Sequence, residues 1–559
     1  MMPNTRAMLI GVVAGLISAL IRGFWFKSGL NWIAFPIVIL ALAVFLALFE
    51  QIAKRFKWQP KRAGLVTGTS EILAHVHLPP EKTFSEHSFW RGMESVLLSM
   101  FGGRVGVEGA ATSFAYAFAL KSRTNSAQWF EQQRRTDAAS ALAAGIACMF
   151  GSPFAAIILP LELNLGGRTL SVAFSAAAAV ATTQLFVTLG FTEALTPTTL
   201  FLEFGVTLEQ SLRLIFFTLS IGLLFGFLSV YFLVLTNSGR EGWNHYRHKL
   251  WFLPASVGCL ILFAILVAYP EGFGLPNALL EGLLNLKDSP TEMALTGLTQ
   301  ILSALVGVNF FGTVGVFTPI FVSGAGFAAA LGTIFFGAYS LPALLGGSAL
   351  LSGIFNTPLT AAFLAYELSG NWTVLLPCFI AAWVSREVVV RFRGRGLVDE
   401  ELQFLGVELL SGRQRSILKS LKVSSAMVTD FDVVTHNESL TELHHRMEKS
   451  KYPFLPVIGQ NNKYMGILTA DIVEYAMSDK TSQSLNLDAK DLLFRSGSRP
   501  KSIQVDDHLD IASEWFEETP LIPVLAEGDK IVGLLFVHNV RIAYDREVAN
   551  RFLLKRKQD

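Results

Sequence analysis

The stretch GGRVGVEGAA (residues 102–111) places a single carboxylate, Glu108, among glycines and small apolar residues. An apolar run, TSFAYAFAL, follows at once, so the acid opens an expected membrane helix. An ionisable group at membrane depth is costly and marks a functional site by default. Three kinds of chemistry are open to Glu108: capping a helix N-terminus, general acid–base catalysis, or standing in for a bound anion.

The stretch around Glu108 has a counterpart later in the chain. GRVGVEG (103–109) aligns with GTVGVFT (312–318), an offset of 312 − 103 = 209. Downstream, FGSPFAAIILPLEL (150–163) aligns with FNTPLTAAFLAYEL (355–368), an offset of 355 − 150 = 205. In both downstream stretches a proline is followed nine residues later by a glutamate, Glu162 or Glu367. This shared spacing predicts a common hydrogen-bonding role at helix ends.

Duplicated halves are typical of transporters, in which discontinuous helices from both halves meet near the membrane midplane. Helix N-termini present free N–H groups and the positive end of the helix dipole, which suits an anion. Glycine lets the backbone approach the ion, and small side chains leave the N–H groups open. These features predict an anion pathway in which the side chain of Glu108 replaces the ion.

Composition limits the other possibilities. The chain has 559 residues, of which 52% are hydrophobic and only 16% charged, and its mean hydropathy is +0.46. Soluble proteins carry about 25% charged residues, so most of this chain is expected to lie in lipid. A net charge of +1 gives no basic surface for nucleic acid. Cys148, Cys259 and Cys378 lie in apolar runs, and His75 and His77 lack a third ligand nearby, so neither a disulfide nor a metal is expected.

The apolar runs predict many membrane helices. Two runs precede the basic cluster KRFKWQPKR (54–62), which places the N-terminus in the cytoplasm and favours a retained first helix over a signal peptide. Several later runs are interrupted by glycine and proline, as in FGTVGVFTPIFVSGAGF. Irregular backbone at this depth is tolerated where it is buried in protein or lines a watery path. Broken helices therefore favour a transporter or channel over a receptor or an anchored enzyme.

Residues 8–410 resemble the CLC family of chloride channels and chloride/proton exchangers. The family's second motif is similar to GVEGA (106–110) and its third, Gly-x-Phe-x-Pro, to GVFTP (315–319), while its first falls on VTGTS (66–70). The resemblance implies an all-α polytopic membrane domain, residues 1–410, built from two inverted-topology repeats (about 1–200 and 210–410) with broken and re-entrant helices. It also implies a homodimer in the plasma (inner) membrane with both termini cytoplasmic, and chloride as the transported ligand.

The resemblance also implies roles for individual residues. The central ion would lie on the N–H groups of Val316 and Phe317, and the gating carboxylate of Glu108 would occupy a neighbouring outer site. Thr67 would stand at an ion-coordinating serine. The full set of anion-binding residues implied in this way is Thr67, Gly68, Gly106, Val107, Gly109, Gly315, Val316 and Phe317.

Departures from the family pattern bear on mechanism. In the family's exchangers an acid that relays protons follows the first-half glutamate, but here Leu163 follows Glu162. The family's tyrosine ligand falls at Val398, so that hydroxyl is lost as well. We therefore expect a channel-like pathway, with a chloride/proton antiporter that uses water or another acid as the alternative. A membrane enzyme using Glu108 is the remote alternative, because Thr67 is its sole candidate partner, and no enzyme is expected.

The chain changes character near residue 411. FLPVIGQNNKYMGIL (454–468) aligns with LIPVLAEGDKIVGLL (521–535) at an offset of 67, and this tail resembles a pair of α+β cytoplasmic CBS modules (about 420–480 and 495–555 within 411–559). Such pairs regulate membrane transporters and can bind adenine nucleotides. Thr469 and Asp471 are the nucleotide candidates, but their spacing is one residue short of the usual motif. A platform for dimerisation or gating is the favoured role, and no resident cofactor is expected.

Overall fold

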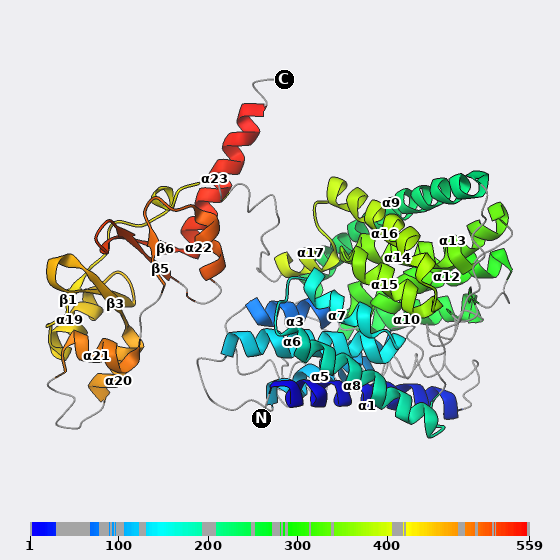
Figure 1. The fold of residues 1–559 in the computed structure, drawn as a ribbon, viewed down its shortest axis with the longest axis horizontal. Coiled ribbons are helices and arrows are strands. Elements are labelled where there is room, and N and C mark those ends of the chain that lie inside the picture. The colour runs from blue at the N-terminus through cyan, green and yellow to red at the C-terminus, as the bar shows by residue number, and fades with distance from the viewer. Residues whose placement is uncertain are drawn as a thin grey trace. The chain divides into compact units, whose positions relative to one another are not determined.

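The computed structural model describes residues 3–28, 68–77, 106–121, 130–192, 208–247, 252–270, 289–311, 315–336, 340–404, 421–478, 487–497, 501–516 and 521–555, with a few single residues between them. The chain divides into two compact units, Met1–Leu409 and Leu410–Asp559 (Figure 1). The first is helical, and the second combines short helices with two small sheets. The helical unit matches the all-α membrane domain expected from the sequence, and the second unit matches the expected α+β tail.

The helices of the first unit form two sets that follow the sequence repeat. The first set is α1 (Pro3–Ser28), α5 (Val107–Lys121), α6 (Phe130–Phe150), α7 (Pro153–Glu162) and α8 (Thr169–Thr188). The second set is α9 (Leu208–Arg247), α13 (Phe317–Phe336), α14 (Ser340–Phe355), α15 (Pro358–Ser369) and α16 (Leu375–Phe392). The remaining helices are α3 (Gly68–His77), α10 (Phe252–Ala268), α12 (Pro290–Val306) with its π-helical extension η3 (Gly307–Phe311), the short η4 (Trp372–Val374) and α17 (Leu397–Phe404).

Packing repeats with the sequence. The helix α1 packs on α8 as α9 packs on α16, and α6 packs on α8 as α14 packs on α16. The starts of α1 and α9 are 208 − 3 = 205 residues apart, and so are those of α7 and α15, 358 − 153 = 205. The two halves therefore share one packing plan. Their opposite orientation in the membrane stays a prediction.

The helices α7 and α15 contact each other through reciprocal hydrogen bonds. The carboxylate of Glu162, at the end of α7, accepts from the N–H groups of Leu359 and Thr360, both at 2.8 Å. The carboxylate of Glu367, near the end of α15, accepts from the N–H groups of Phe154 and Ala155, both at 2.9 Å. Amides in the first turn of a helix have no partner within the helix, and the glutamates supply one. The helix-end role predicted for both glutamates is confirmed.

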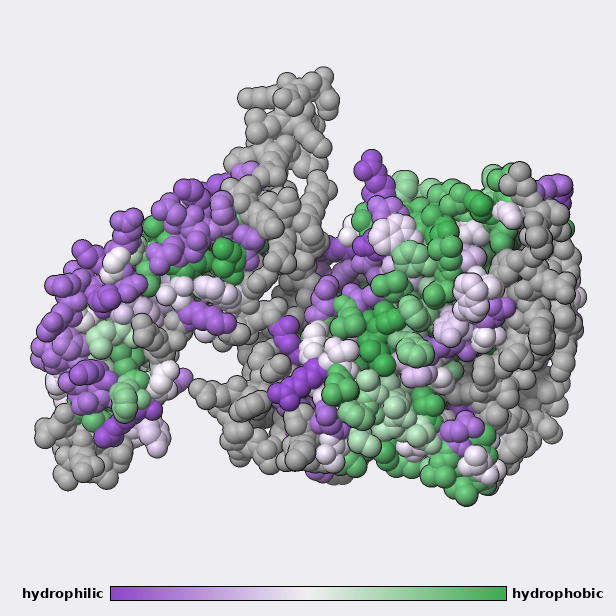
Figure 2. All heavy atoms as spheres, in the orientation of Figure 1, coloured by the Kyte–Doolittle hydropathy of each residue, from purple (hydrophilic) through white to green (hydrophobic). Residues whose placement is uncertain are grey.

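Six helices among the described residues are long and apolar enough to cross a membrane. These candidate spans are Asn4–Phe24, Thr169–Thr188, Ser211–Arg240, Pro290–Phe311, Phe317–Phe335 and Trp372–Gln403. Figure 2 shows broad hydrophobic surface on the helical unit and mostly hydrophilic surface on the other. Inside, helices approach closely through small residues: a Cβ at Gly324 would lie 2.2 Å from the carbonyl oxygen of Gly346. Such contacts between glycines are a usual means of helix packing in membranes.

The second unit contains two three-stranded sheets with the same strand order. The strands are β1 (Val434–Thr435), β2 (Phe454–Ile458) and β3 (Tyr464–Thr469) in one sheet, and β4 (Ile503–Gln504), β5 (Leu521–Ala526) and β6 (Lys530–Phe536) in the other. In each, the first strand is parallel to the second and the second antiparallel to the third, so that Phe454 pairs with Thr469 and Leu521 with Phe536. The flanking helices are α19 (Leu440–Lys449), α20 (Ala470–Ser478), α21 (Ala489–Ser496), α22 (Leu509–Trp515) and α23 (Val537–Lys555), with the short η5 (Val423–Ser425) and η6 (Gln460–Asn462).

Candidate anion site at Glu108

The two glycine-rich motifs meet in space. The N–H group of Gly106 donates to the carbonyl oxygen of Gly315 at 2.7 Å, and the two residues form an isolated antiparallel bridge. The helix α5 begins one residue after Gly106, and α13 begins two residues after Gly315. Two helix N-termini, one from each half, therefore start beside the same bridge. Helix N-termini attract negative charge through their free N–H groups and their dipoles.

The carboxylate of Glu108 lies at the N-terminus of α13. Its Oε1 atom accepts a hydrogen bond from the backbone N–H of Thr318 at 3.0 Å, and its Oε2 atom accepts one from the Thr318 hydroxyl at 2.9 Å. The side chain is 4% exposed. An acid from the first half thus lies at a helix N-terminus of the second half, where a small anion could bind.

Glycines make room for this carboxylate. A Cβ at Gly106 would lie 1.8 Å from Oε2 and 2.0 Å from Oε1 of Glu108. A Cβ at Gly315 would lie 2.7 Å from the Glu108 carboxyl carbon and 2.5 Å from the Gly106 carbonyl oxygen. Real Cβ atoms do not come this close to other atoms, so both positions need glycine for the site to exist as it stands.

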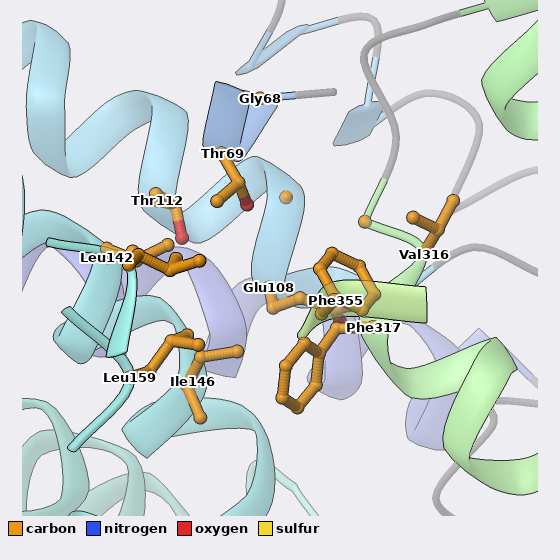
Figure 3. Close-up of a pocket in the computed structure, with 13 residues that line it drawn as sticks. Gly68, Thr69, Glu108, Thr112, Leu142, Ile146, Leu159, Val316, Phe317 and Phe355 are labelled. Atoms are coloured by element: carbon orange, nitrogen blue, oxygen red, sulfur yellow. The ribbon is translucent and has the colours of Figure 1, made fainter. Parts of the chain in front are cut away.

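A small cavity of about 20 Å³ adjoins the carboxylate, with room for roughly one water molecule. Most of its wall is apolar, and Figure 3 shows Leu142, Ile146 and Leu159 across the cavity from Phe317. Glu108 and the hydroxyl-bearing Thr69 and Thr112 contribute polar groups. The lining residues are Gly68, Thr69, Glu108, Gly109, Thr112, Leu142, Ile146, Leu159, Leu163, Gly315, Val316, Phe317 and Phe355.

Aromatic rings fix Phe317 beside the cavity. Its ring contacts those of Phe150 and Phe355, with centroids 6.1 Å and 5.3 Å apart. Phe150 ends α6 and Phe355 ends α14, and these positions are equivalent in the repeat, 355 − 150 = 205. All three rings are at most 5% exposed. The side chain of the first residue of α13 is therefore held by matching residues of both halves.

Most of the residues singled out from the sequence come together at this site. Gly68, Gly109 and Val316 line the cavity, and so does Leu163, the position where the family's exchangers would carry an acid. Val398 is 2% exposed within α17 and is not among the lining residues. Thr67 and the side chain of Val107 lie outside the described part of the chain.

Three polar residues of the site were missed by the sequence reasoning: Thr69, Thr112 and Thr318. Thr318 had a signal, because it directly follows Phe317 inside GVFTP. Thr69 follows Gly68 in the same way, and Thr112 lies one helical turn after Glu108. Among the described residues, no group of three histidine, cysteine, aspartate or glutamate side chains is placed to hold a metal ion.

The nucleotide candidates lie in the second unit, at a strand-to-helix junction. Thr469 ends β3, and Asp471 lies in the first turn of α20 with its side chain exposed. At the corresponding junction of the other sheet Phe536 ends β6, and its ring stacks on those of Tyr452 and His538. The hydroxyl-to-acid pair is therefore present in one module and replaced by an aromatic stack in the other.

Solved structures share this fold. A eukaryotic CLC transporter aligns with 96% of this chain and 97% of its own at 18% identity, with a TM-score of 0.65. A slow cyanobacterial Cl⁻/H⁺ antiporter aligns over 73% of this chain and 99% of its own, also at 18% identity, with a TM-score of 0.58. Among curated proteins, chloride channel protein CLC-e from Arabidopsis thaliana is 27% identical over 191 residues, which are 28% of this chain. The chain covers only 27% of the length of that relative.

Sequence models of two families match the chain. The model described as "Voltage gated chloride channel" matches residues 42–389, which include Glu108, Leu163 and Phe317, and a CBS domain model matches residues 423–478. The first match covers more than half of the chain and contains α5 and α13, the two helices that begin beside Glu108. The protein therefore belongs to the voltage-gated chloride channel family, as an integral membrane protein with a CBS domain near its C-terminus.

Proposed function

We propose that the protein conducts chloride across the membrane along a pathway that the carboxylate of Glu108 blocks. The observation that carries the proposal is the bonding of this carboxylate to the N–H and hydroxyl groups of Thr318, at the N-terminus of α13. A carboxylate and a chloride ion carry the same charge and accept hydrogen bonds from the same donors. One of them must leave before the other can bind.

Protonation of the Glu108 carboxylate weakens its binding at the N-terminus of α13. A neutral carboxyl group no longer gains the charge-assisted hydrogen bonds that hold an anion at a helix N-terminus. An anion that retains its charge then competes better for the same N–H groups. On this proposal chloride flux rises as the pH falls, because a larger fraction of Glu108 is protonated.

Channel-like conduction is supported by Leu163. This residue lines the same cavity as Glu108, and leucine cannot pass on a proton that Glu108 has bound. We therefore propose uncoupled chloride flow. Antiport remains the competing function because a structural relative is a Cl⁻/H⁺ antiporter. If an imposed chloride gradient drove protons uphill in vesicles, antiport would replace the channel proposal.

Chloride efflux from proteoliposomes tests the gate. Glu108→Gln and Glu108→Ala both remove the charge, and they should raise chloride flux at neutral pH and abolish its pH dependence. Glu209→Gln is the matched control, since Glu209 is an exposed glutamate in the first turn of α9, paired with Arg213 at 2.5 Å. If both Glu108 variants kept the wild-type flux and pH profile, Glu108 would not be the gate.

A further inference from the structure

Thr318 holds both oxygens of the Glu108 carboxylate. Its backbone N–H bonds to one oxygen at 3.0 Å and its hydroxyl to the other at 2.9 Å. Any residue other than proline could supply the backbone donor, but only serine or threonine could supply the second donor with so short a side chain. The motif Gly-x-Phe-x-Pro leaves this position open, so the hydroxyl is a feature of this chain.

The position of Thr318 in its helix explains why its hydroxyl is free to serve a ligand. Threonine inside a helix commonly bonds to the carbonyl oxygen four residues earlier. Thr333, later in α13, does this with the carbonyl oxygen of Ala329 at 2.9 Å. Thr318 is the second residue of α13, so no residue of that helix precedes it by four positions. Its hydroxyl points instead to the carboxylate that occupies the anion site.

Departure of Glu108 would leave both donors of Thr318 buried without an acceptor, because the residue is 0% exposed. A buried donor without a partner is strongly unfavourable. A small anion in the vacated place can accept both hydrogen bonds and remove this cost. The cost of opening the gate is therefore smaller when the anion enters as the carboxylate leaves.

We propose that the Thr318 hydroxyl is a side-chain ligand of the transported anion in the site that Glu108 vacates. This inference rests on the proposed function, in which Glu108 and the anion exchange places. The hydroxyl donates to the carboxylate in the blocked state and to the anion in the open state. A hydroxyl donor favours compact, strongly accepting anions such as chloride over diffuse ones such as iodide or thiocyanate.

The ligand role of Thr318 can be tested separately from gating in Glu108→Ala protein, which lacks the blocking carboxylate and is called gateless below. In Glu108→Ala protein, Thr318→Val keeps the shape of the side chain and removes the donor, whereas Thr318→Ser keeps the donor. We expect Thr318→Val to raise the half-saturating chloride concentration of flux about tenfold, as expected for loss of a hydrogen bond to a charged partner. Thr318→Ser should restore the original value. Thr333→Val is the matched control on the same helix and should change nothing, since that hydroxyl donates to Ala329 and to the Met293 sulfur and does not contact Glu108.

Direct binding separates this proposal from the gating proposal. Calorimetric titration of chloride into the detergent-solubilised full chain carrying Glu108→Ala measures affinity whether or not Glu108 controls flux. Weaker binding in Thr318→Val, with recovery in Thr318→Ser, supports the ligand role. Equal chloride affinity in the protein with Thr318, in Thr318→Val and in Thr318→Ser overturns the ligand role and leaves the gating proposal intact. Unchanged flux in Glu108→Ala would overturn the gate alone. Should Thr318→Val aggregate, Thr318→Ala replaces it, with thermal melting as the check on folding.

Discussion

In the function proposed above, single residues decide whether the carboxylate of Glu108 or an anion lies at the start of α13. Glu108 and Thr318 supply the exchangeable acceptor and the donors, and Gly106 supplies the space between the two halves. The donors are fixed by a helix and by packed phenylalanine rings, whereas the acceptor sits on a side chain that can rotate. Gating requires this combination of donors that stay in place and an acceptor that can move away.

The first prediction concerns the space at Gly106 in gateless protein. In the Glu108→Ala background, Gly106→Ala should lower chloride flux about tenfold, equivalent to about 1.4 kcal/mol in the barrier. The physical reason is that the added methyl group fills the place that the carboxylate oxygens occupied, less than 2.1 Å away, and the anion must pass there. Flux from proteoliposomes, normalised to protein, is the measurement.

The fold should tolerate this change, which makes the result interpretable. The three atoms closest to a Cβ at Gly106 all belong to the Glu108 side chain, which Glu108→Ala removes. Gly242→Ala is the control, because a Cβ at this position on α9 meets nothing within 4 Å. Flux equal to that of Glu108→Ala alone would mean that the anion does not use the place of the carboxylate.

Part of this site could be predicted from the sequence, and the rest could not, for a physical reason. Glu108 could be singled out because an acid among glycines at membrane depth is visible in the sequence itself, whereas Phe317 was implied by the resemblance of GVFTP to a family motif. The hydroxyl bond of Thr318 to Glu108 joins residues 210 positions apart, and it depends on the register of the bridge between Gly106 and Gly315. No local pattern carries that register.

At the scale of elements, α7 and α15 stabilise each other because a glutamate of each helix accepts hydrogen bonds from the first turn of the other. Glu162 of α7 accepts from the first turn of α15, and Glu367 of α15 accepts from the first turn of α7. The Thr360 hydroxyl adds a third bond to Glu162, at 2.6 Å. The sequence spacing from proline to glutamate predicted helix ends, but it could not show that each glutamate serves the other helix. That exchange needs the two halves to be packed together.

The second prediction follows from the number of bonds that each glutamate accepts. Glu162→Ala leaves three donors without their acceptor and Glu367→Ala leaves two. Loss of an acceptor costs about 1–3 kcal/mol for a buried donor. Thr360 and Ala155 are buried, whereas Leu359 and Phe154 are exposed. Glu162→Ala removes the acceptor of both donors of Thr360 and should therefore lie nearer the upper end of that range. Unfolding in detergent, followed by circular dichroism, measures both free energies.

A further variant tests whether the Thr360 hydroxyl bond explains the larger destabilisation expected for Glu162→Ala. Thr360→Val removes the hydroxyl bond alone and should account for most of the difference between the two glutamate variants. Glu387→Gln serves as a control, because Glu387 is an exposed glutamate on α16 whose carboxylate lies 3.6 Å from Arg386. Equal destabilisation by Glu162→Ala and Glu367→Ala would contradict the count of bonds.

At the scale of the molecule, two units with different chemistry share one chain. The helical unit is built for lipid, and the second unit has hydrophobic cores of its own, each around one of its sheets. The change in composition near residue 411 and the repeat of 67 residues predicted this second unit and its two similar modules. Their strand order could not be predicted in detail, because β1 and β4 are only two residues long and leave little pattern in the sequence.

The last prediction is that acid weakens the second unit through exposed carboxylates at its surface. The N–H and hydroxyl groups of Ser439 both donate to Glu442 at 2.9 Å, and these hydrogen bonds hold the pKa of Glu442 below its ordinary value of 4.5. Lys451 pairs with Asp430 at 2.9 Å and lowers the pKa of that carboxyl from 3.8. A carboxyl whose pKa is lower in the folded state binds protons more readily when unfolded, so stability rises with pH. The stabilisation is complete above about pH 4.5 and is lost as the pH falls through the folded-state values.

Calorimetry of the intact protein in detergent should therefore show a transition that is absent from a chain ending at 409. The midpoint temperature of this transition should be constant from pH 7 to 5 and should fall below pH 5. Glu442→Gln should flatten that fall, whereas Glu474→Gln, an exposed glutamate of α20, should leave it unchanged. An equal slope in wild type and Glu442→Gln would rule out this capping interaction as a source of acid sensitivity.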